Sequence, residues 1–392
     1  MTSIREAIRK LFTPQKPLPA GMYSYQSPPD AEVPLKAHLR IEPDGRGVLI
    51  VNASTVLHLN QTATEYAWHM IQQTPEGKIA NQIAQRYRVS ATQAEQDYAN
   101  FRERILTLLQ TPNLDPVAYL GFERETPYAG EIAVPYRLDC AITYRLPAGT
   151  ARDAAPHARV DSELTTEEWK SILSRAWDAG IPHIVFTGGE PTLRADLIAL
   201  ISHAEALGQV TGLLSDGLYL NNANYLHTLL QTGLDHLMLV LQPENPASWK
   251  ALETVLPEDL FTTVHLTITT ENADQVTDLV DRLADLGVNS LSLSANTPEL
   301  DPAMEAARQQ AAERLLDLTW DLPVPYSTRN PVNLELEEAA EEEGTAAPAE
   351  GAGRAWLYIE PDGDVLREQG RTTVLGNAIN DNWAEIWQRS NE

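Results

Sequence analysis

Residues 183–196 read His-Ile-Val-Phe-Thr-Gly-Gly-Glu-Pro-Thr-Leu-Arg-Ala-Asp, and the architecture of the chain can be worked out from them. The β-branched and aromatic run Ile184–Thr187 predicts a short buried strand, which ends where two glycines let the backbone turn. Apolar residues then recur at helical spacing over Leu193–Leu207. The turn Gly188–Pro191 therefore lies at the carboxyl end of a strand in a strand–helix unit, which is where α/β folds place ligands.

Strand and helix patterns alternate on both sides of this unit. Such alternation without hairpin signals implies an α/β fold with a parallel sheet. The other strands are expected at Tyr136–Arg145, Val210–Leu214, His236–Leu241, Thr263–Thr269 and Ser290–Ser294.

Composition narrows the possible partners. The chain has 392 residues and a formal net charge of −26, so nucleic-acid backbones and anionic membranes would be repelled, and neutral, basic or peptidic partners are expected. Its one cysteine excludes a disulfide framework and an all-cysteine iron–sulfur cluster held by this chain alone. Because no apolar run approaches the length of a membrane span and no signal peptide opens the chain, a cytoplasmic protein is expected.

Two motifs carry a family resemblance. Thr187-Gly-Gly-Glu-Pro-Thr-Leu-Arg194 is followed by Leu214-Ser-Asp-Gly-Leu-Tyr-Leu220, and this combination resembles the radical-SAM family, in particular its members with a SPASM-type C-terminal extension. In that family the Gly-Gly-Glu-Pro segment binds the amino group and methionine part of S-adenosylmethionine (SAM), and the fold is a partial, TIM-like (β/α)6 barrel. The resemblance implies a possible SAM site at Gly188, Gly189, Glu190, Pro191, Ser215 and Asp216. The alternative is that Gly188–Pro191 persists only as a turn that the fold needs.

The family's cluster loop, CxxxCxxC after the first strand, is not matched. Here the strand is followed by Leu146-Pro-Ala-Gly-Thr-Ala-Arg-Asp153, and the three degenerate cluster positions are Leu146, Thr150 and Asp153. Iron–sulfur clusters need soft thiolates, so we expect no cofactor except a possible SAM, and no iron–sulfur cluster. Cys140 lies within the strand and is interpreted as a core residue.

Other polar residues give no further site. His183, His236 and His265 lie on different strands without a usable metal spacing, so no metal is expected, and no catalytic residue is assigned.

The N-terminal part divides into two predicted segments. Residues 1–34 read as a short amphipathic helix and a Pro-rich extended linker. Residues 35–112 read as three strands, the turn Glu42–Gly45 and three helices, the first with Thr62 and Glu65 spaced for a capping box. This order, with the string Val56-Leu-His-Leu-Asn-Gln-Thr-Ala63, resembles the PqqD-like winged-helix domain that recognises peptides by strand addition. DNA binding and simple packing on the barrel are the alternatives, and the last helix is too poor in positive charge for DNA.

The C-terminal part divides into three. Residues 113–333 are expected to form the radical-SAM-like partial barrel, and 334–353 an acidic linker. Residues 354–392, with a Pro361-Asp-Gly hairpin turn, resemble a degenerate SPASM-like closing segment in which the expected cysteines are replaced, approximately by Glu350 and Glu368.

Together these features predict a cluster-less pseudoenzyme that binds a precursor peptide, an active radical-SAM enzyme, or both, in peptide natural-product biosynthesis. One alternative is an enzyme that keeps SAM at the Gly-Gly-Glu-Pro turn for non-radical chemistry. Another is a radical-SAM enzyme whose cluster ligands come from a partner chain.

Overall fold

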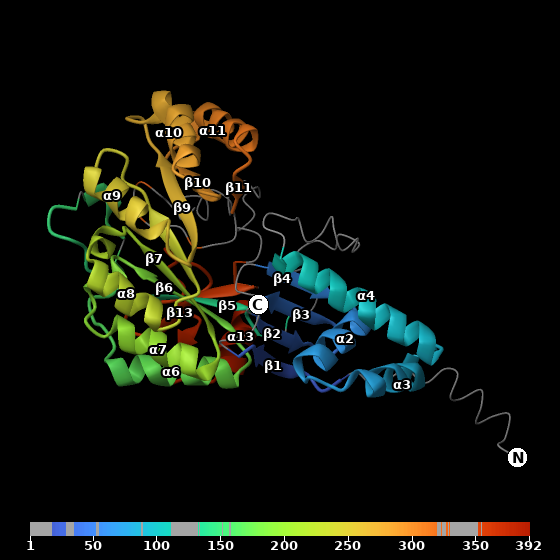
Figure 1. The fold of residues 1–392 in the computed structure, drawn as a ribbon. Coiled ribbons are helices and arrows are strands. Elements are labelled where there is room, and N and C mark those ends of the chain that lie inside the picture. The colour runs from blue at the N-terminus through green and yellow to red at the C-terminus, as the bar shows by residue number, and fades with distance from the viewer. Residues whose placement is uncertain are drawn as a thin grey trace, which may run out of the picture. The chain divides into compact units, whose positions relative to one another are not determined.

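The computed structural model describes residues 18–28, 35–51, 55–87, 89–110, 132, 134–150, 152–156, 158–319, 323, 327, 329, 352–353 and 355–392. The chain divides into two compact units, Met1–Arg124 and Glu125–Glu392, each described here by itself (Figure 1). The short amphipathic helix predicted within residues 1–34 and nearly all of the acidic linker 334–353 lie outside the described residues. Among the described helices, none is long and apolar enough to cross a membrane.

The first unit contains an antiparallel sheet in the order β1-β2-β3-β4. The three predicted strands are confirmed, and the Glu42–Gly45 turn closes with a hydrogen bond from the Gly45 N–H to the Glu42 carbonyl at 2.9 Å. Strand β1 was not predicted, because its sequence was interpreted as extended linker. It is a polar edge strand that packs Tyr23 and Tyr25 against the core. The strands are β1 Gly21–Gln26, β2 Lys36–Ile41, β3 Gly47–Val51 and β4 Thr55–Leu59.

Three helices complete this unit: α2 Gln61–Ile71, α3 Glu76–Tyr87 and α4 Ala91–Gln110. The capping box predicted at Thr62 and Glu65 is wrong. Asn60 caps α2 instead, because its side chain accepts from the Ala63 N–H at 2.9 Å. Glu65 is buried, where it pairs with Arg86 at 2.7 Å and so holds α2 against α3.

The second unit is built on a ten-stranded sheet in the order β11-β10-β9-β8-β7-β6-β5-β12-β13-β14. Strands β5 to β11 are all parallel and follow the chain order, which confirms the predicted α/β fold with a mainly parallel sheet. Among the described strands, β11 and β14 are the two edges of this sheet, which is open. These strands are β5 Arg137–Thr143, β6 His183–Gly188, β7 Val210–Ser215, β8 His236–Val240, β9 Phe261–Ile268, β10 Ser290–Ala295 and β11 Asp317–Leu318.

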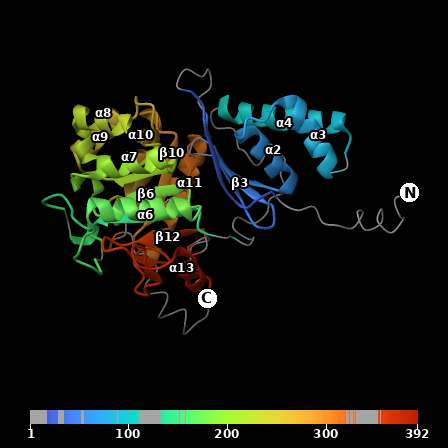
Figure 2. The ribbon, with the colours of Figure 1, turned by 90° about the horizontal axis from the view of Figure 1, so that it is seen from below.

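Helices connect the parallel strands, and α6, α7, α8 and α9 follow one another along one face of the sheet (Figures 1 and 2). Their apolar stripes share one core with alternate strand residues such as Leu138, Phe186 and Leu213. The capping box predicted at Thr165 and Glu168 is confirmed at the start of α6. The helices are α6 Thr166–Asp178, α7 Leu197–Leu207, α8 Ala223–Gln231, α9 Pro246–Val255, α10 Val276–Asp285 and α11 Asp301–Glu313.

The C-terminal segment extends the same sheet. Strand β12 (Trp356–Ile359) runs parallel to β5, with Leu357 opposite Leu138. The predicted hairpin at Pro361-Asp-Gly is confirmed, since β13 (Asp364–Leu366) returns antiparallel to β12. Strand β14 (Gly376–Asn377) and helix α13 (Trp383–Ser390) follow. Leu357 is fully buried in the core of the main sheet, so this segment stabilises the sheet directly.

Two glycines at the end of β6 are required by close backbone approach. Gly188 has a φ of +123°, and a Cβ there would lie 2.1 Å from the Thr143 carbonyl oxygen. A Cβ at Gly189 would lie 2.2 Å from the Arg145 carbonyl oxygen. The N–H groups of Gly189 and Glu190 donate to those same two carbonyls at 2.7 and 2.8 Å. Two backbone hydrogen bonds therefore hold the turn against the end of β5 and the segment that follows it.

Replacing Leu357 by Ala tests whether β12 belongs to the main core. We expect a loss of about 2–5 kcal/mol in the free energy of unfolding, because the side chain is fully buried. The control Val374→Ala changes a residue that is 39% exposed, and should cost less than about 0.5 kcal/mol. Urea denaturation followed by tryptophan fluorescence measures both, and equal small losses would show that β12 does not contribute to this core.

Replacing Gly188 by Ala tests the turn. The change forces a strained backbone and a clash with Thr143, and should cost about 1–3 kcal/mol or more in the same denaturation experiment. Gly149→Ala is the matched control, because Gly149 also has a positive φ (+89°) but has no atom near the position of its Cβ. A loss at Gly188 no larger than the loss at Gly149 would contradict the packing described here.

Candidate functional site

Glu190 is the centre of the site. It follows β6, is 2% exposed, and caps the short 3₁₀ helix η2 (Pro191–Leu193). Its Oε1 accepts from the Thr192 N–H at 3.0 Å, the Thr192 hydroxyl at 2.6 Å and the Ser215 hydroxyl at 2.9 Å. Its Oε2 accepts from the Asp216 N–H at 2.8 Å. One carboxylate therefore ties the turn after β6 to the end of β7.

The end of β7 has a turn of its own. The Ser215 hydroxyl accepts from the Gly217 N–H at 3.0 Å, and Asp216 Oδ1 accepts from the Leu218 N–H at 2.9 Å. Ser215 is fully buried, whereas Asp216 is half-buried. The structure thus brings together the residues proposed from the sequence, namely Gly188, Gly189, Glu190, Pro191, Ser215 and Asp216.

The chemistry of this set favours a positively charged ligand. The N–H groups of Gly189 and Glu190 are used within the fold, so the turn can offer a ligand acceptors rather than donors. Burial, and after it the negative charge of Asp216, raise the pKa of Glu190 to about 7. The hydrogen bonds from Thr192 and from the Asp216 N–H act in the opposite direction and lower this pKa. Burial also raises the pKa of Asp216. A cation bound beside these carboxyl groups would stabilise their ionised forms.

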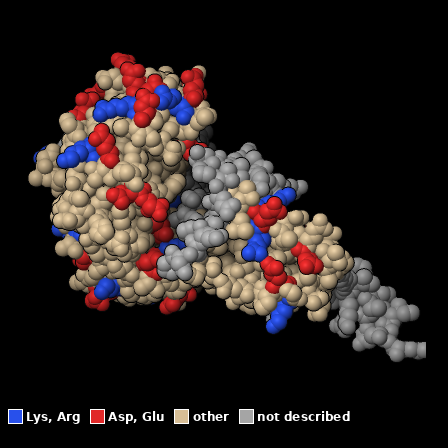
Figure 3. Space-filling model, in the orientation of Figure 1, with Lys and Arg blue, Asp and Glu red and all other residues tan. Residues whose placement is uncertain are grey.

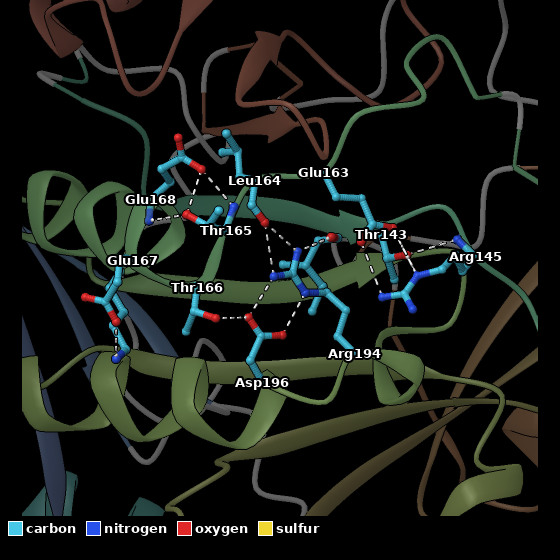
Figure 4. A network of polar contacts seen from close by, with 12 residues as sticks. Thr143, Arg145, Glu163, Leu164, Thr165, Thr166, Glu167, Glu168, Arg194 and Asp196 are labelled. Atoms are coloured by element: carbon cyan, nitrogen blue, oxygen red, sulfur yellow. Dashed lines mark hydrogen bonds and ion pairs between the residues drawn. The ribbon is translucent and has the colours of Figure 1, made fainter.

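Arg194 holds the framework around the site (Figure 4). Its guanidinium is 6% exposed and donates to both oxygens of Asp196, at 2.8 and 2.7 Å. It also donates to the carbonyls of Ile142 at 2.8 Å and Leu164 at 3.1 Å, which lie at the end of β5 and before α6. Chiefly because of the hydrogen bonds from Arg194, the pKa of Asp196 falls to about 2. Sequence reasoning did not identify this role, since nothing in the local pattern reveals carbonyls contributed by distant segments.

The loop after β5 holds the three positions where the resemblance places cluster ligands. Leu146 is half-buried, and Thr150 is exposed with its hydroxyl bonded to the Pro147 carbonyl at 2.8 Å. The side chain of Asp153 lies outside the described residues. Cys140 is fully buried within β5, where burial raises its pKa well above the usual value. The chain's own residues therefore offer this loop no thiolate donor.

Contacts within the unit anchor the start of this loop. The Tyr144 hydroxyl lies 3.1 Å from both the Tyr358 hydroxyl and Glu360 Oε1. Arg159 donates to Glu360 and Asp364 at 2.5 Å each, so the loop is tied to the β12–β13 hairpin. Glu360 and Asp364, with Asp362, form the one group of possible metal ligands among the described residues, and Arg159 neutralises two of its three carboxylates.

Two histidines meet at the opposite end of the sheet. The Nε2 atoms of His183 and His236 lie 2.7 Å apart, although the two residues start different strands. His236 is buried, and burial lowers its pKa to about 4. Because the pair lies at the amino ends of β6 and β8, it is separate from Glu190, which follows the carboxyl end of β6.

Comparison with known proteins finds a matching family and similar proteins of one kind. The model of the radical SAM superfamily matches residues 140–256. A PqqA peptide cyclase from Streptomyces rochei is 30% identical over 288 residues, which cover 66% of this chain and 77% of that protein. One from Bradyrhizobium diazoefficiens is 28% identical over 307 residues, or 68% of this chain and 77% of that protein.

Solved structures share the fold. Streptococcus suis SuiB bound to the precursor peptide SuiA superposes with a TM-score of 0.56 at 14% identity, covering 89% of this chain and 86% of that chain. SuiB bound to SAM gives a TM-score of 0.54 at 15% identity, covering 90% and 86%.

These findings correct one expectation. We expected no cofactor beyond a possible SAM, and no iron–sulfur cluster, but the superfamily is one whose members bind SAM and iron–sulfur clusters, and a protein of this fold has been solved with SAM bound. The expectation of no cofactor beyond a possible SAM, and of no iron–sulfur cluster, is therefore contradicted by this family match. From its sequence match and its homology to PqqA peptide cyclases, the chain belongs to the radical SAM superfamily.

Proposed function

We propose that this protein binds SAM at Glu190 and a precursor peptide at its N-terminal unit, and that it acts by binding, as a pseudoenzyme in peptide natural-product biosynthesis. The observation that carries the proposal is the contrast between two sites of one sheet. The Glu190 carboxylate after β6 accepts four hydrogen bonds, whereas the loop after β5 contains no cysteine. The protein would present the peptide to an active modifying enzyme, or escort that enzyme.

The N-terminal unit supports the peptide part of this proposal. Strands β2 to β4 followed by three helices match the element order of a PqqD-like winged helix, which we propose for residues 35–112. The solved relative SuiB carries a precursor peptide. A peptide can add as a further strand at a sheet edge. We propose the β4 edge, because the β1 edge is flanked by Pro19 and Pro28, which hinder strand addition.

Surface charge favours a peptide over nucleic acid. Arg102 on α4 pairs with Glu76 at 2.6 Å instead of standing unopposed. The face of the molecule in Figure 3 shows Lys and Arg scattered among Asp and Glu, without a continuous basic patch over the described residues. With a net charge of −26, a DNA backbone would be repelled.

At the proposed SAM site, the residues of this chain bind the ligand and orient it. SAM, when bound, supplies an alkyl group activated by its positively charged sulfur. Glu190 would accept from the ligand's ammonium group, while Thr192, Ser215 and the Asp216 N–H hold the carboxylate in place. We propose the remaining parts as a radical-SAM-like partial barrel over residues 113–333, an acidic linker over 334–353, and a degenerate SPASM-like segment over 354–392.

An enzyme using SAM for non-radical chemistry is the second candidate. The observation in its favour is the pKa of Glu190, which lies near 7 and suits a general base. Incubation with SAM and the peptide encoded beside the gene separates the two: S-adenosylhomocysteine formed in proportion to modified peptide would favour the enzyme. A radical-SAM enzyme with thiolates from a partner chain is a third candidate, tested by anaerobic reconstitution of the protein with that partner.

Calorimetric titration with SAM tests the site. Because a cation favours ionised Glu190, and the pKa of the free group is raised to about 7, affinity should increase about tenfold between pH 5.5 and 7. Glu190→Gln should bind at least about tenfold more weakly at pH 7 and lose this pH dependence. The exposed residue Glu253 on α9 provides the control, Glu253→Gln, which should behave like the wild type.

The same raised pKa of Glu190 predicts how the stability of the free protein depends on pH. The folded state holds the proton of Glu190 more tightly than the unfolded state, so stability should fall as the pH rises from the ordinary Glu range through 7. SAM should reverse this trend, which thermal denaturation at several pH values measures.

In the calorimetric titration, a wild-type affinity for SAM that is independent of pH and unchanged in Glu190→Gln would rule out this site.

Hydrogen exchange with the precursor peptide tests the N-terminal unit. Adding the short peptide encoded beside the gene should slow exchange at the β4 amides of residues 55–59, because strand addition would hydrogen-bond the peptide backbone to this strand. A scrambled peptide is the control. Protection confined to β1, or absent from both edges, would contradict the proposed mode of binding.

A further inference from the structure

The amino-terminal end of the parallel sheet holds a close pair of histidines on two strands that are not neighbours. The Nε2 atoms of His183 and His236 lie 2.7 Å apart, and the rings meet edge to face with their centroids 4.9 Å apart. Strand β7 lies between β6 and β8. Its Gly212, opposite His236, leaves room for the contact, because a Cβ there would lie 2.2 Å from His236 Cε1. The contact therefore joins β6 to β8 across β7.

The distance identifies this contact as a hydrogen bond rather than a pair of metal ligands. Two imidazole nitrogens that bind one tetrahedral zinc ion at about 2.0–2.1 Å lie roughly 3.3 Å from each other. The two Nε2 atoms are closer than that, at a distance typical of a short hydrogen bond. Such a bond requires one Nε2 to carry a hydrogen and the other to be bare.

The charged groups near the pair disfavour an additional positive charge. On β5, Arg137 is opposite His183 in the sheet and pairs with Asp139 at 2.7 Å. Just before β8, the Asp235 carboxylate accepts from a backbone N–H of β7 at 2.8 Å. Each of the two carboxylates thus has a partner of its own, whereas the charge of Arg137 opposes protonation of His236.

Burial keeps His236 neutral at neutral pH. The residue is 4% exposed, and its neighbours across the sheet, Gly212 on β7 and Phe261 on β9, do not titrate. Burial, and after it the positive charge of Arg137, lower the pKa of His236 to about 4. An unfolded chain holds a histidine proton with a pKa of about 6.5. The unfolded state therefore takes up this proton more readily than the folded state.

We propose that the His183–His236 pair is an acid-sensitive clasp, which holds β6 and β8 together while a single hydrogen lies between the two Nε2 atoms. Uptake of a proton by the bare nitrogen leaves two N–H groups facing each other and adds a charge near Arg137, so the hydrogen bond is lost. The clasp should stabilise the fold fully above about pH 6.5 and progressively less as the pH falls towards 4. This inference does not depend on SAM or peptide binding.

Nitrogen NMR of the histidine rings tests the hydrogen bond in the wild type without any substitution. In protein labelled with nitrogen-15 histidine at pH 7.5, one ring of the pair should show a protonated Nε2 and the other a bare one. A scalar coupling between these two nitrogens, transmitted through the hydrogen bond, identifies the pair. Absence of this coupling, or two protonated Nε2 atoms at this pH, would overturn the proposal.

Urea denaturation tests the pH dependence on the full chain. Because Glu190 acts in the opposite direction, wild type and His236→Gln are compared at each pH. The ratio of their folding equilibrium constants, wild type over variant, should fall about 10- to 30-fold between pH 7.5 and 5. The control His227→Gln, at an exposed position on α8, should give a nearly constant ratio.

Two results of the denaturation experiment would contradict the clasp. One is a ratio for His236→Gln that does not change between the two pH values. The other is stabilisation of the wild type by equimolar zinc that is lost in His236→Gln, since it would show that the pair is a metal site.

Discussion

The structure around the site depends on one buried carboxylate. Glu190 accepts from Thr192 on its own turn and from Ser215 and Asp216 at the end of the next strand. Four donors to one carboxylate offset much of its desolvation but add no positive charge. Hydrogen bonds from neutral groups thus hold the turn after β6 at the carboxyl edge of the sheet. The glycines before Glu190 let this turn approach the segment after β5 closely enough to pair with it.

The ion pairs nearby have a different role. Arg194 is saturated by Asp196 and by carbonyls from two other segments, so it fixes the positions of β5, α6 and α7. Arg159 joins the loop after β5 to the C-terminal hairpin in the same way. In the part of the chain that the structure describes, these arginines pair with Asp196, Glu360 and Asp364, and none of the ion pairs involves Glu190 or Asp216. These ion pairs therefore support the segments around Glu190 rather than Glu190 itself.

Much of the fold was predictable because it follows local patterns. Buried β-branched runs located the parallel strands, and the spacing of Thr165 and Glu168 located the start of α6. Pairing between distant segments was not predictable, because no local pattern records that β12 lies beside β5. Strand β1 was missed since an edge strand needs little apolar sequence, and the cap of α2 was misplaced because Asn60 competes with Thr62 for the same role.

The residues of the site also divide into those that a local motif predicts and those that depend on distant segments. The motif identified Glu190, Ser215 and Asp216, but not the carbonyls that accept from Arg194, because Ile142 and Leu164 lie in distant segments of the chain. The proposal that this chain binds SAM through Glu190 is tested most directly by equilibrium dialysis of radiolabelled SAM against the purified wild type and Glu190→Gln. The account predicts stoichiometric retention by the wild type that unlabelled SAM displaces. Equal retention by Glu190→Gln would contradict it.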